Sequence, residues 1–217
     1  MDTEVVQERG PRLGRWAAVG VGVLALATTG AGNPPMEVDP WETLEYEGSG
    51  DTVLMVDQHD DPRIATVTYD GERHFSVWAV DPRGENQDLL VNTTGRYEGT
   101  VLYNVLVGEE LAALDISATG PWRIELKPLA DTDEWGEGED SYSGTGDDVV
   151  WLMWEPEGFS VLDISHSGER HFSVWAYADQ DRDLLVNTRG DYEGQARLPA
   201  GSFLLEISAE GDWRIDR

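Results

Sequence analysis

Two histidines, two serines and two tryptophans stand at matching positions of this sequence and form its most suggestive candidate site. They are His74, Ser76 and Trp78, with His171, Ser173 and Trp175. Both sets lie in stretches where apolar and polar residues alternate, as in a β-strand whose successive side chains point to opposite faces. Each set therefore shares one face, where an exposed Trp beside His and Ser could stack on a sugar ring or dock a partner. The alternative is that a loop or the other half of the chain covers the tryptophans.

The same residues raise the question of a hydrolase, because Ser and His together form many nucleophilic sites. On one strand, His74 and Ser76 would lie about 7 Å apart, which is too far for a hydrogen bond. No Gly-x-Ser-x-Gly elbow is present either. The chain has no cysteine, which excludes thiol catalysis and Cys-ligated zinc. We therefore expect a protein that is not an enzyme, with no catalytic residue.

Three alternating carboxylates, Asp179, Asp181 and Asp183, form a weak candidate for a metal site. Clustered carboxylate oxygens are the ligands that Ca²⁺ takes. However, the cluster has no counterpart in the first half of the chain, and no EF-hand spacing follows it. Among 43 acidic residues, such clusters arise by chance. We expect a solvated acidic loop, and no metal or other cofactor.

An internal repeat organises these residues. Residues 71–79 recur unchanged as 168–176, and 88–93 recur as 183–188. A Gly-x-Trp-Arg-Ile string at 120–124 recurs at 211–215. Each copy is roughly 80 residues long, which suits a small domain. We place the first copy at 45–128, the second at 141–217, and an acidic linker at 129–140.

Short apolar runs separated by Gly or acidic turns predict seven to eight strands in each copy, and no long helix. The expected fold class is all-β, with two tandem β-sandwich domains of a jelly-roll-like kind. Alternation assigns four residues of each copy to the core face: Phe75, Val77, Trp122 and Ile124, with Phe172, Val174, Trp213 and Ile215.

The N-terminal 32 residues predict an export signal or a membrane anchor. Arg9, Arg12 and Arg15 precede an uncharged segment rich in Gly and Ala, at 16–32. Residues 33–44 would link this segment to the first copy. Both interpretations leave the arginines in the cytoplasm and the rest of the chain outside it. The membrane would then be contacted only through the N-terminal segment.

The charge balance is strongly acidic. The chain holds 43 acidic and 15 basic residues, a net charge of −28, and Lys127 is its only lysine. Such a surface repels itself in dilute salt, and molar salt screens the repulsion. This composition is typical of a halophile. It also argues against nucleic acid as a partner, because binding it requires a basic surface.

The repeated strings Gly-x-x-x-Phe-x-Val-Trp-Ala, Asp-Leu-Leu-Val-Asn-Thr and Gly-x-Trp-Arg-Ile resemble uncharacterised β-sandwich modules of secreted haloarchaeal and actinobacterial envelope proteins. These modules are similar to the pre-peptidase C-terminal type of jelly roll. The resemblance covers both copies. It implies the fold and an extracytoplasmic address, secreted or anchored in the cytoplasmic membrane, and it carries no catalytic residue.

Together these features favour an extracytoplasmic binding or structural module of the cell envelope, which acts by contact with a protein or a glycan. One alternative is a non-catalytic accessory subunit of a secreted enzyme or transport system. A second alternative is a hydrolase.

We expect the fold to require salt, because loss of screening at a net charge of −28 leaves the acidic surface repelling itself. Circular dichroism across a salt series should show strand signal and melting temperature falling as salt is removed. An unchanged spectrum and melting temperature from roughly 3 M down to roughly 0.05 M salt would contradict the halophile interpretation.

Overall fold

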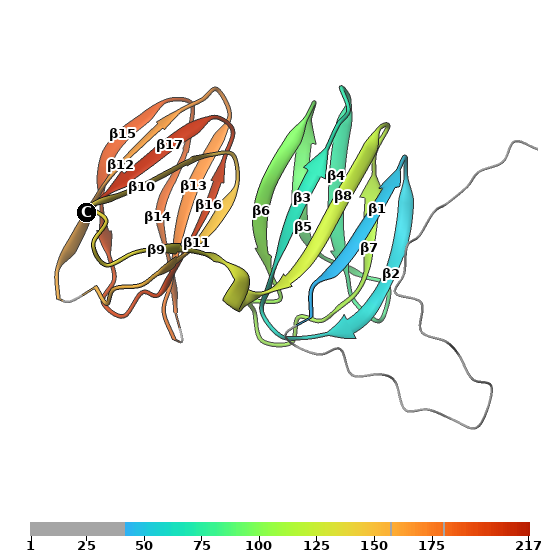
Figure 1. Ribbon diagram of the computed structural model, residues 1–217, viewed down its shortest axis with the longest axis horizontal. Helices are drawn as coiled ribbons and strands as arrows, with labels where there is room; N and C mark the ends of the chain where they lie inside the picture. Colours follow the sequence, from blue (N-terminus) through green and yellow to red (C-terminus); the bar gives the residue numbers. More distant parts are fainter. Residues whose placement is uncertain (1–41, 157, 180) are drawn as a thin grey trace, which may run out of the picture.

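The structure is a computed structural model that describes residues 42–156, 158–179 and 181–217. The expected signal or anchor at 1–32, and nearly all of the expected linker at 33–44, lie outside the described residues. Within the described part, no helix is long and apolar enough to cross a membrane. That part forms two β-sandwiches, which lie side by side in Figure 1.

The first sandwich holds eight strands in two sheets. They are β1 (Leu44–Ser49), β2 (Thr52–His59), β3 (Arg63–Tyr69), β4 (His74–Val80), β5 (Asn86–Thr94), β6 (Tyr97–Tyr103), β7 (Leu111–Ser117) and β8 (Pro121–Pro128). One sheet has the order β1-β8-β3-β6 and the other β2-β7-β4-β5. This is the strand order of a jelly roll, with strands distant in sequence paired antiparallel.

The second sandwich repeats this order. Its strands are β10 (Ser141–Thr145), β11 (Asp148–Leu152), β12 (Ser160–Ser167), β13 (His171–Tyr177), β14 (Arg182–Arg189), β15 (Tyr192–Leu198), β16 (Leu204–Ala209) and β17 (Asp212–Asp216). They form the sheets β10-β17-β12-β15 and β14-β13-β16-β11, the latter extended by one further strand, β9. The two repeated nine-residue strings lie on the equivalent strands β4 and β13. The predicted fold class, all-β with two tandem sandwiches, is therefore confirmed.

The segment between the sandwiches differs from its prediction. Residues 129–140 were expected to be an acidic linker, but they contain a 3-10 helix, η1 (Leu129–Asp131), and the strand β9 (Asp133–Trp135). Strand β9 runs parallel to β11, and the Trp135 side chain is fully buried in the second core. The Trp135 ring packs edge-on against Trp154, and its Nε1 donates to the Glu139 carbonyl at 3.0 Å. Burial of this ring makes the end of the segment part of the second sandwich.

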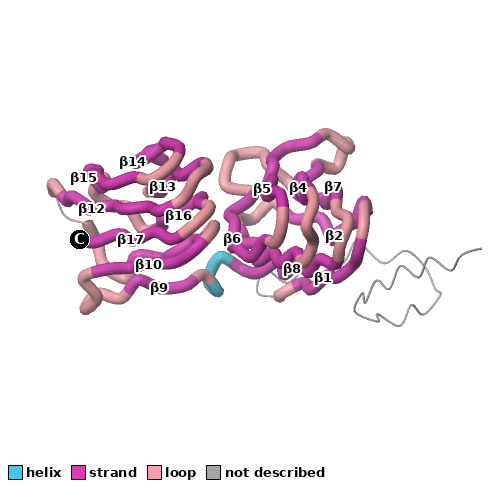
Figure 2. The backbone as a smooth tube through the Cα atoms, turned by 90° about the horizontal axis from the view of Figure 1, so that it is seen from above, coloured by secondary structure: helices cyan, strands magenta, loops and turns pink. Residues whose placement is uncertain are grey.

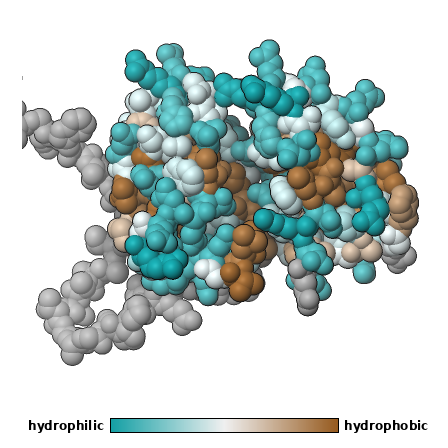
Figure 3. All heavy atoms as spheres, turned by 180° about the vertical axis from the view of Figure 1, so that it is seen from behind, coloured by the Kyte–Doolittle hydropathy of each residue, from teal (hydrophilic) through white to brown (hydrophobic). Residues whose placement is uncertain are grey.

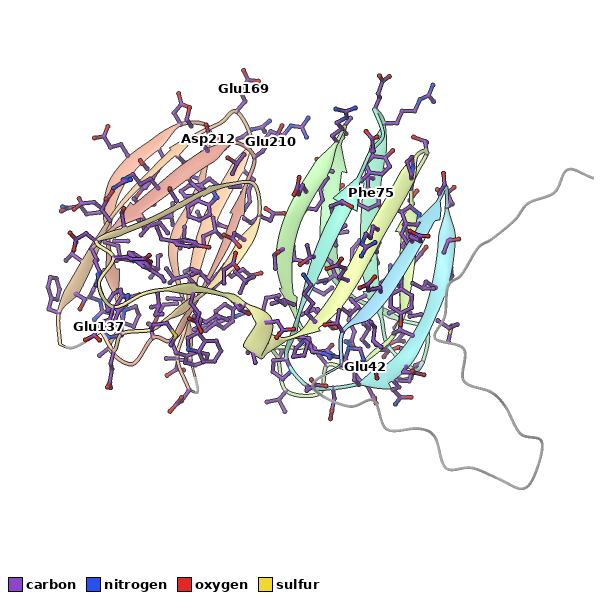
Figure 4. The ribbon with its side chains drawn as sticks, in the orientation of Figure 1. Glu42, Phe75, Glu137, Glu169, Glu210 and Asp212 are labelled. Carbon is purple, nitrogen blue, oxygen red and sulfur yellow. The ribbon has the colours of Figure 1, made fainter. Side chains whose placement is uncertain are left out.

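Between the two sheets of each sandwich, the inward side chains form a closed apolar core. All eight residues assigned to the core face are at most 5% exposed, which confirms that prediction. Figure 4 shows Phe75 between the sheets of the first sandwich. Its ring stacks on Tyr69, with centroids 4.3 Å apart, and in the second sandwich Phe172 stacks on His166 at 4.4 Å. His166 therefore takes the structural place of Tyr69.

Strand β6 is shorter than the mostly apolar run from Thr100 to Val107, which predicts a strand over its whole length. The run extends to Val107, but the strand ends at Tyr103, because Asn104 adopts a positive φ of 56°. The Asn104 amide donates to the His59 carbonyl at 3.0 Å, which stabilises this conformation. Val107 lies beyond the turn and is exposed.

We expect Trp135→Ala to destabilise the second sandwich, because it removes a fully buried indole and leaves a cavity. The free energy of unfolding should fall by about 3–5 kcal/mol, measured by denaturant titration in molar salt. Phe159→Ala is the control, since its ring is 79% exposed and should cost under about 1 kcal/mol. Equal midpoints for the two variants would show that residues 129–140 are only a linker.

Candidate functional site

The two sandwiches pack together through one outer sheet face of each. The buried part of this contact consists of Ile64 and Leu102 from the first sandwich, with Val149, Tyr177 and Leu204 from the second. Half-buried apolar side chains surround it: Val105, Leu129, Trp151, Trp175 and Phe203. In Figures 1 and 2, β6 is the strand of the first sandwich that lies against the second. The outer face of such a sheet is usually polar, so these apolar side chains mark a contact surface.

Asp147, in the turn between β10 and β11, joins the sandwiches by hydrogen bonds. Its Oδ2 accepts from the Tyr97 hydroxyl at 2.6 Å, and its Oδ1 accepts from Ala209 N at 2.8 Å. Its carbonyl accepts from Thr100 N at 2.9 Å. Because Thr100 is on the edge strand β6, the turn gives a partner to an otherwise open edge of the sheet.

Burial at this contact raises the pKa of the Asp147 carboxyl, because desolvation disfavours its charged form. The bonds from Tyr97, Ala209 and the Ser208 hydroxyl act in the opposite direction and stabilise the carboxylate. The pKa of Tyr97 is raised by burial and by the neighbouring Asp147 charge, so its hydroxyl stays a donor. The approach leaves little room at position 99, where a Cβ would lie 2.7 Å from the Tyr97 hydroxyl and 3.1 Å from Asp147 Cβ, so a larger residue there would displace one of them.

A cleft of about 1320 Å³ opens between the sandwiches beside this contact, and both copies line it. The first sandwich contributes the hydroxyl groups of Thr66, Thr68 and Thr100, and the second contributes Arg170 and His171. Figure 4 shows Glu210, another lining residue, at the edge of the second sandwich that faces the first. Small-molecule pockets usually enclose roughly 300–1,000 Å³ and are mostly apolar, so this larger cleft, whose lining is about half polar, suits an extended ligand that carries polar groups better.

Both signs of charge stand around the cleft. Arg96 pairs with Asp70 at 2.8 Å on the first sandwich, and Arg170 pairs with Glu210 at 2.8 Å on the second. All four side chains are about half exposed or more, and ion pairs in water contribute little stability. The two guanidinium groups can therefore exchange these partners for a ligand's carboxylate or hydroxyl groups at small cost.

The predicted residues of the first copy lie away from this cleft. His74 is exposed, Ser76 is buried at 8% exposure, and Trp78 is half-buried on the outer face of the β2-β7-β4-β5 sheet. Trp78 is flanked across the sheet by Leu89 and Asp115. A role of this face in binding a ligand or partner stays a prediction.

The equivalent residues of the second copy have different surroundings. His171 is exposed and lines the cleft, whereas Ser173 is buried at 5% exposure. Trp175 packs at the edge of the apolar contact between the sandwiches, and the Arg182 guanidinium lies 4.9 Å from its ring centroid. The outer face that carries Trp175 is thus turned toward the first sandwich, which is the covered alternative stated from the sequence.

The weak calcium candidates are not brought together into a site. Asp179, Asp181 and Asp183 are all exposed, and Ala178 N donates to the Asp181 carbonyl at 2.9 Å. Throughout residues 42–156, 158–179 and 181–217, no three His, Cys, Asp or Glu side chains are grouped so that they could hold a metal ion.

Sequence reasoning missed Tyr97 and Asp147, the residues that join the copies. Both belong to short repeated strings that are typical of turns, since Tyr-Glu-Gly stands at 97–99 and 192–194 and Gly-Asp at 50–51 and 146–147. The sequence nonetheless held a signal for the contact between the sandwiches. Ile64 and Leu102 fall on the outward positions of their strands, where alternation predicts polar residues.

No family model matches this chain, and a comparison with curated protein sequences finds no match. Among solved structures, the regulatory domain of PKA from Toxoplasma gondii with cAMP is 10% identical, with a TM-score of 0.24, and the match covers 80% of this chain and 76% of that one. Allantoicase from Saccharomyces cerevisiae is 13% identical, with a TM-score of 0.24 and coverage of 82% and 77%. A further allantoicase structure is 14% identical, with a TM-score of 0.22 and coverage of 71% and 73%. Similarity at this level supports no functional argument.

We expect Asp147→Asn to weaken the dependence of stability on pH. Folding raises the pKa of the Asp147 carboxyl above its value in the unfolded chain, which is about 3.9 for Asp. Between these two pKa values the folded state binds more protons than the unfolded state. The free energy of unfolding therefore falls as the pH rises through this range. Between about pH 4.5 and pH 7, the melting temperature of the wild type should therefore fall more than that of Asp147→Asn.

The control for this measurement is Asp51→Asn, at the equivalent but exposed carboxylate of the first copy. Its pH profile should match the wild type. Asp88, Asp148 and Glu206, whose pKa values burial also raises, contribute a remaining slope in all three proteins. Identical profiles for Asp147→Asn and the wild type would exclude Asp147 as a contributing group.

Proposed function

We propose that this protein is an extracytoplasmic binding or structural module of the cell envelope of a halophile, acting by contact with a protein or a glycan. The observation that carries the proposal is the cleft between the two sandwiches, with its hydroxyl, guanidinium and imidazole groups. It is built from both copies, so the duplication itself creates a surface that a single sandwich lacks.

The chemistry of the cleft favours an extended polar chain as its occupant. Threonine hydroxyl groups on β3 and β6 line one wall, and Thr66 Oγ1 lies 3.3 Å from Thr100 Oγ1 in a row of donors and acceptors. His171 and Arg170 add nitrogen donors from the opposite wall. Hydroxyl groups on one wall, with guanidinium and imidazole groups on the other, suit the hydroxyl and carboxylate groups of a glycan, or the backbone of a peptide segment.

Two further features support a role in binding rather than catalysis. The rings of His59 and His166 are held inside the fold, by the Tyr103 hydroxyl and the Asp57 carbonyl for His59, and by two backbone carbonyls for His166. Ser76 and Ser173 are buried, whereas His74 and His171 are exposed. Neither serine hydroxyl is therefore open to a substrate beside its histidine.

The strongly acidic surface supports the halophilic setting. Figure 3 shows hydrophilic residues over much of the face it presents, and the whole chain carries a net charge of −28. In molar salt the Debye length falls to about 3 Å, so short-range contacts within the cleft would dominate binding over long-range charge.

We expect His171→Ala to weaken ligand binding at least tenfold, because the imidazole lies in the wall of the cleft. The measurement is binding of immobilised envelope polysaccharides and of solubilised envelope proteins to the full chain in molar salt. The matched control is His74→Ala, which removes the same residue from the identical string outside the cleft and should bind as the wild type. Equal loss in both variants, or binding in neither assay, would refute the cleft as the functional site.

A further inference from the structure

The contact between the sandwiches uses two kinds of surface, and the repeat supplies each kind twice. The first sandwich contributes the outer face of its β1-β8-β3-β6 sheet, and the second contributes the outer face of its β14-β13-β16-β11-β9 sheet. One surface of each kind is thus left over. We call the outer face of β2-β7-β4-β5 the front face, and the outer face of β10-β17-β12-β15 the back face.

The front face is apolar where its counterpart is buried. Val53 and Met55 on β2 are equivalent to Val149 and Trp151 on β11. The turns before these two strands repeat, and the strands pair with the equivalent strands β7 and β16. Val149 is 1% exposed in the contact between the sandwiches, whereas Val53 is 66% and Met55 72% exposed. Two apolar side chains this exposed, at positions whose counterparts are buried in a contact, indicate a partner.

Both remaining surfaces also retain the polar half of the contact. Tyr192 and Gly194 on the edge strand β15 repeat Tyr97 and Gly99, and Asp51 repeats Asp147. The Asp51 carboxylate accepts from Ala118 N at 2.9 Å, as Asp147 does from Ala209 N, but it is exposed. A groove on the second sandwich is lined by Ser165, Tyr192 and Arg214. Their equivalents on the first sandwich, Thr68, Tyr97 and Arg123, line the cleft.

One replacement on the back face introduces a positive charge, while Asp163 and Gln195 replace Thr66 and Thr100 and pair with each other at 2.7 Å. Arg197 stands on β15 where Leu102 stands on β6. Leu102 packs in the cluster that contains Val149 and Leu204, whose front-face equivalents are Val53 and Ala113. Asp115 lies two residues beyond Ala113 on the same side of β7, so an arginine seated there would meet a carboxylate.

We propose that copies of this chain associate head to tail, with the back face of one copy against the front face of the next and Tyr192 donating to Asp51. The contact would repeat the one already made between the two sandwiches of each chain. Because it joins two different surfaces, it does not close on itself after two copies and continues into a linear assembly. This inference is independent of the proposed ligand, although each new contact would create another cleft.

The test uses cysteine cross-linking of the full chain in molar salt, since the natural sequence has no cysteine. The variant combines Ser49→Cys and Gln195→Cys in one chain. Ser49 and Gln195 occupy the positions equivalent to Thr145 and Thr100, which both line the cleft between the sandwiches. A short bis-maleimide should produce a ladder of dimers, trimers and higher species. Each single-cysteine variant should produce at most a trace of dimer. A ladder that is absent, or one in which a single variant forms dimers as efficiently as the double variant, overturns head-to-tail association.

A second measurement needs no new cross-link. The mass-average molar mass of the full chain, from sedimentation velocity in molar salt, should rise with concentration past that of a dimer. Met55→Lys should shift this rise to at least tenfold higher concentration, and Met153→Lys, at an exposed methionine outside the front face, should leave it unchanged. Circular dichroism confirms the folding of both variants. Two outcomes overturn the proposal. One is a monomer at every concentration, as when another segment of the chain covers the front face, and the other is a mass that stops at that of a dimer.

Discussion

The hydrogen bond from Tyr97 to Asp147 sits where the two halves of this protein meet, and the cleft depends on it. A carboxylate withdrawn from water is costly unless donors surround it. Here the donors come from both sandwiches: the Tyr97 hydroxyl from one, with Ala209 N and the Ser208 hydroxyl from the other. Separating the sandwiches would remove the Tyr97 donor while the two from its own sandwich remain, so this interaction orients the copies as well as holding them.

Apolar packing behind that bond supplies the area that a single hydrogen bond cannot. Ile64 and Leu102 stand on strand positions that would face water in an isolated sandwich. Against them lie Val149, Tyr177 and Leu204, so each sandwich covers what the other exposes. The result differs from two domains on a flexible tether. The walls of the cleft are sheet faces held in fixed relation, and a ligand meets groups that are already in place.

Much of the fold could be predicted because the repeat and the alternation of residues agree with each other. Phe75 and Trp122, with their counterparts, are buried as their strand positions require. Trp135 could not be placed, because its acidic surroundings favour a linker and its pairing partner, β11, follows only after a turn and another strand. The candidate site was predicted less well for a different reason. Identical strings such as those around His74 and His171 give identical predictions, but only one copy has a neighbour on that side.

In each sandwich, the first and last strands of the repeated set of eight pair with each other. Leu44 at the start of β1 is paired with Leu126 near the end of β8, and Ser141 is paired with Asp216 in the same manner. The hydrogen bonds of an antiparallel pair lie perpendicular to the strands. Tension on the two ends of a sandwich would therefore break these hydrogen bonds one after another, because it does not load all of them at once. The polypeptide is therefore mechanically weak along its own length. A force applied across the broad faces of the sheets would not act along these terminal pairs.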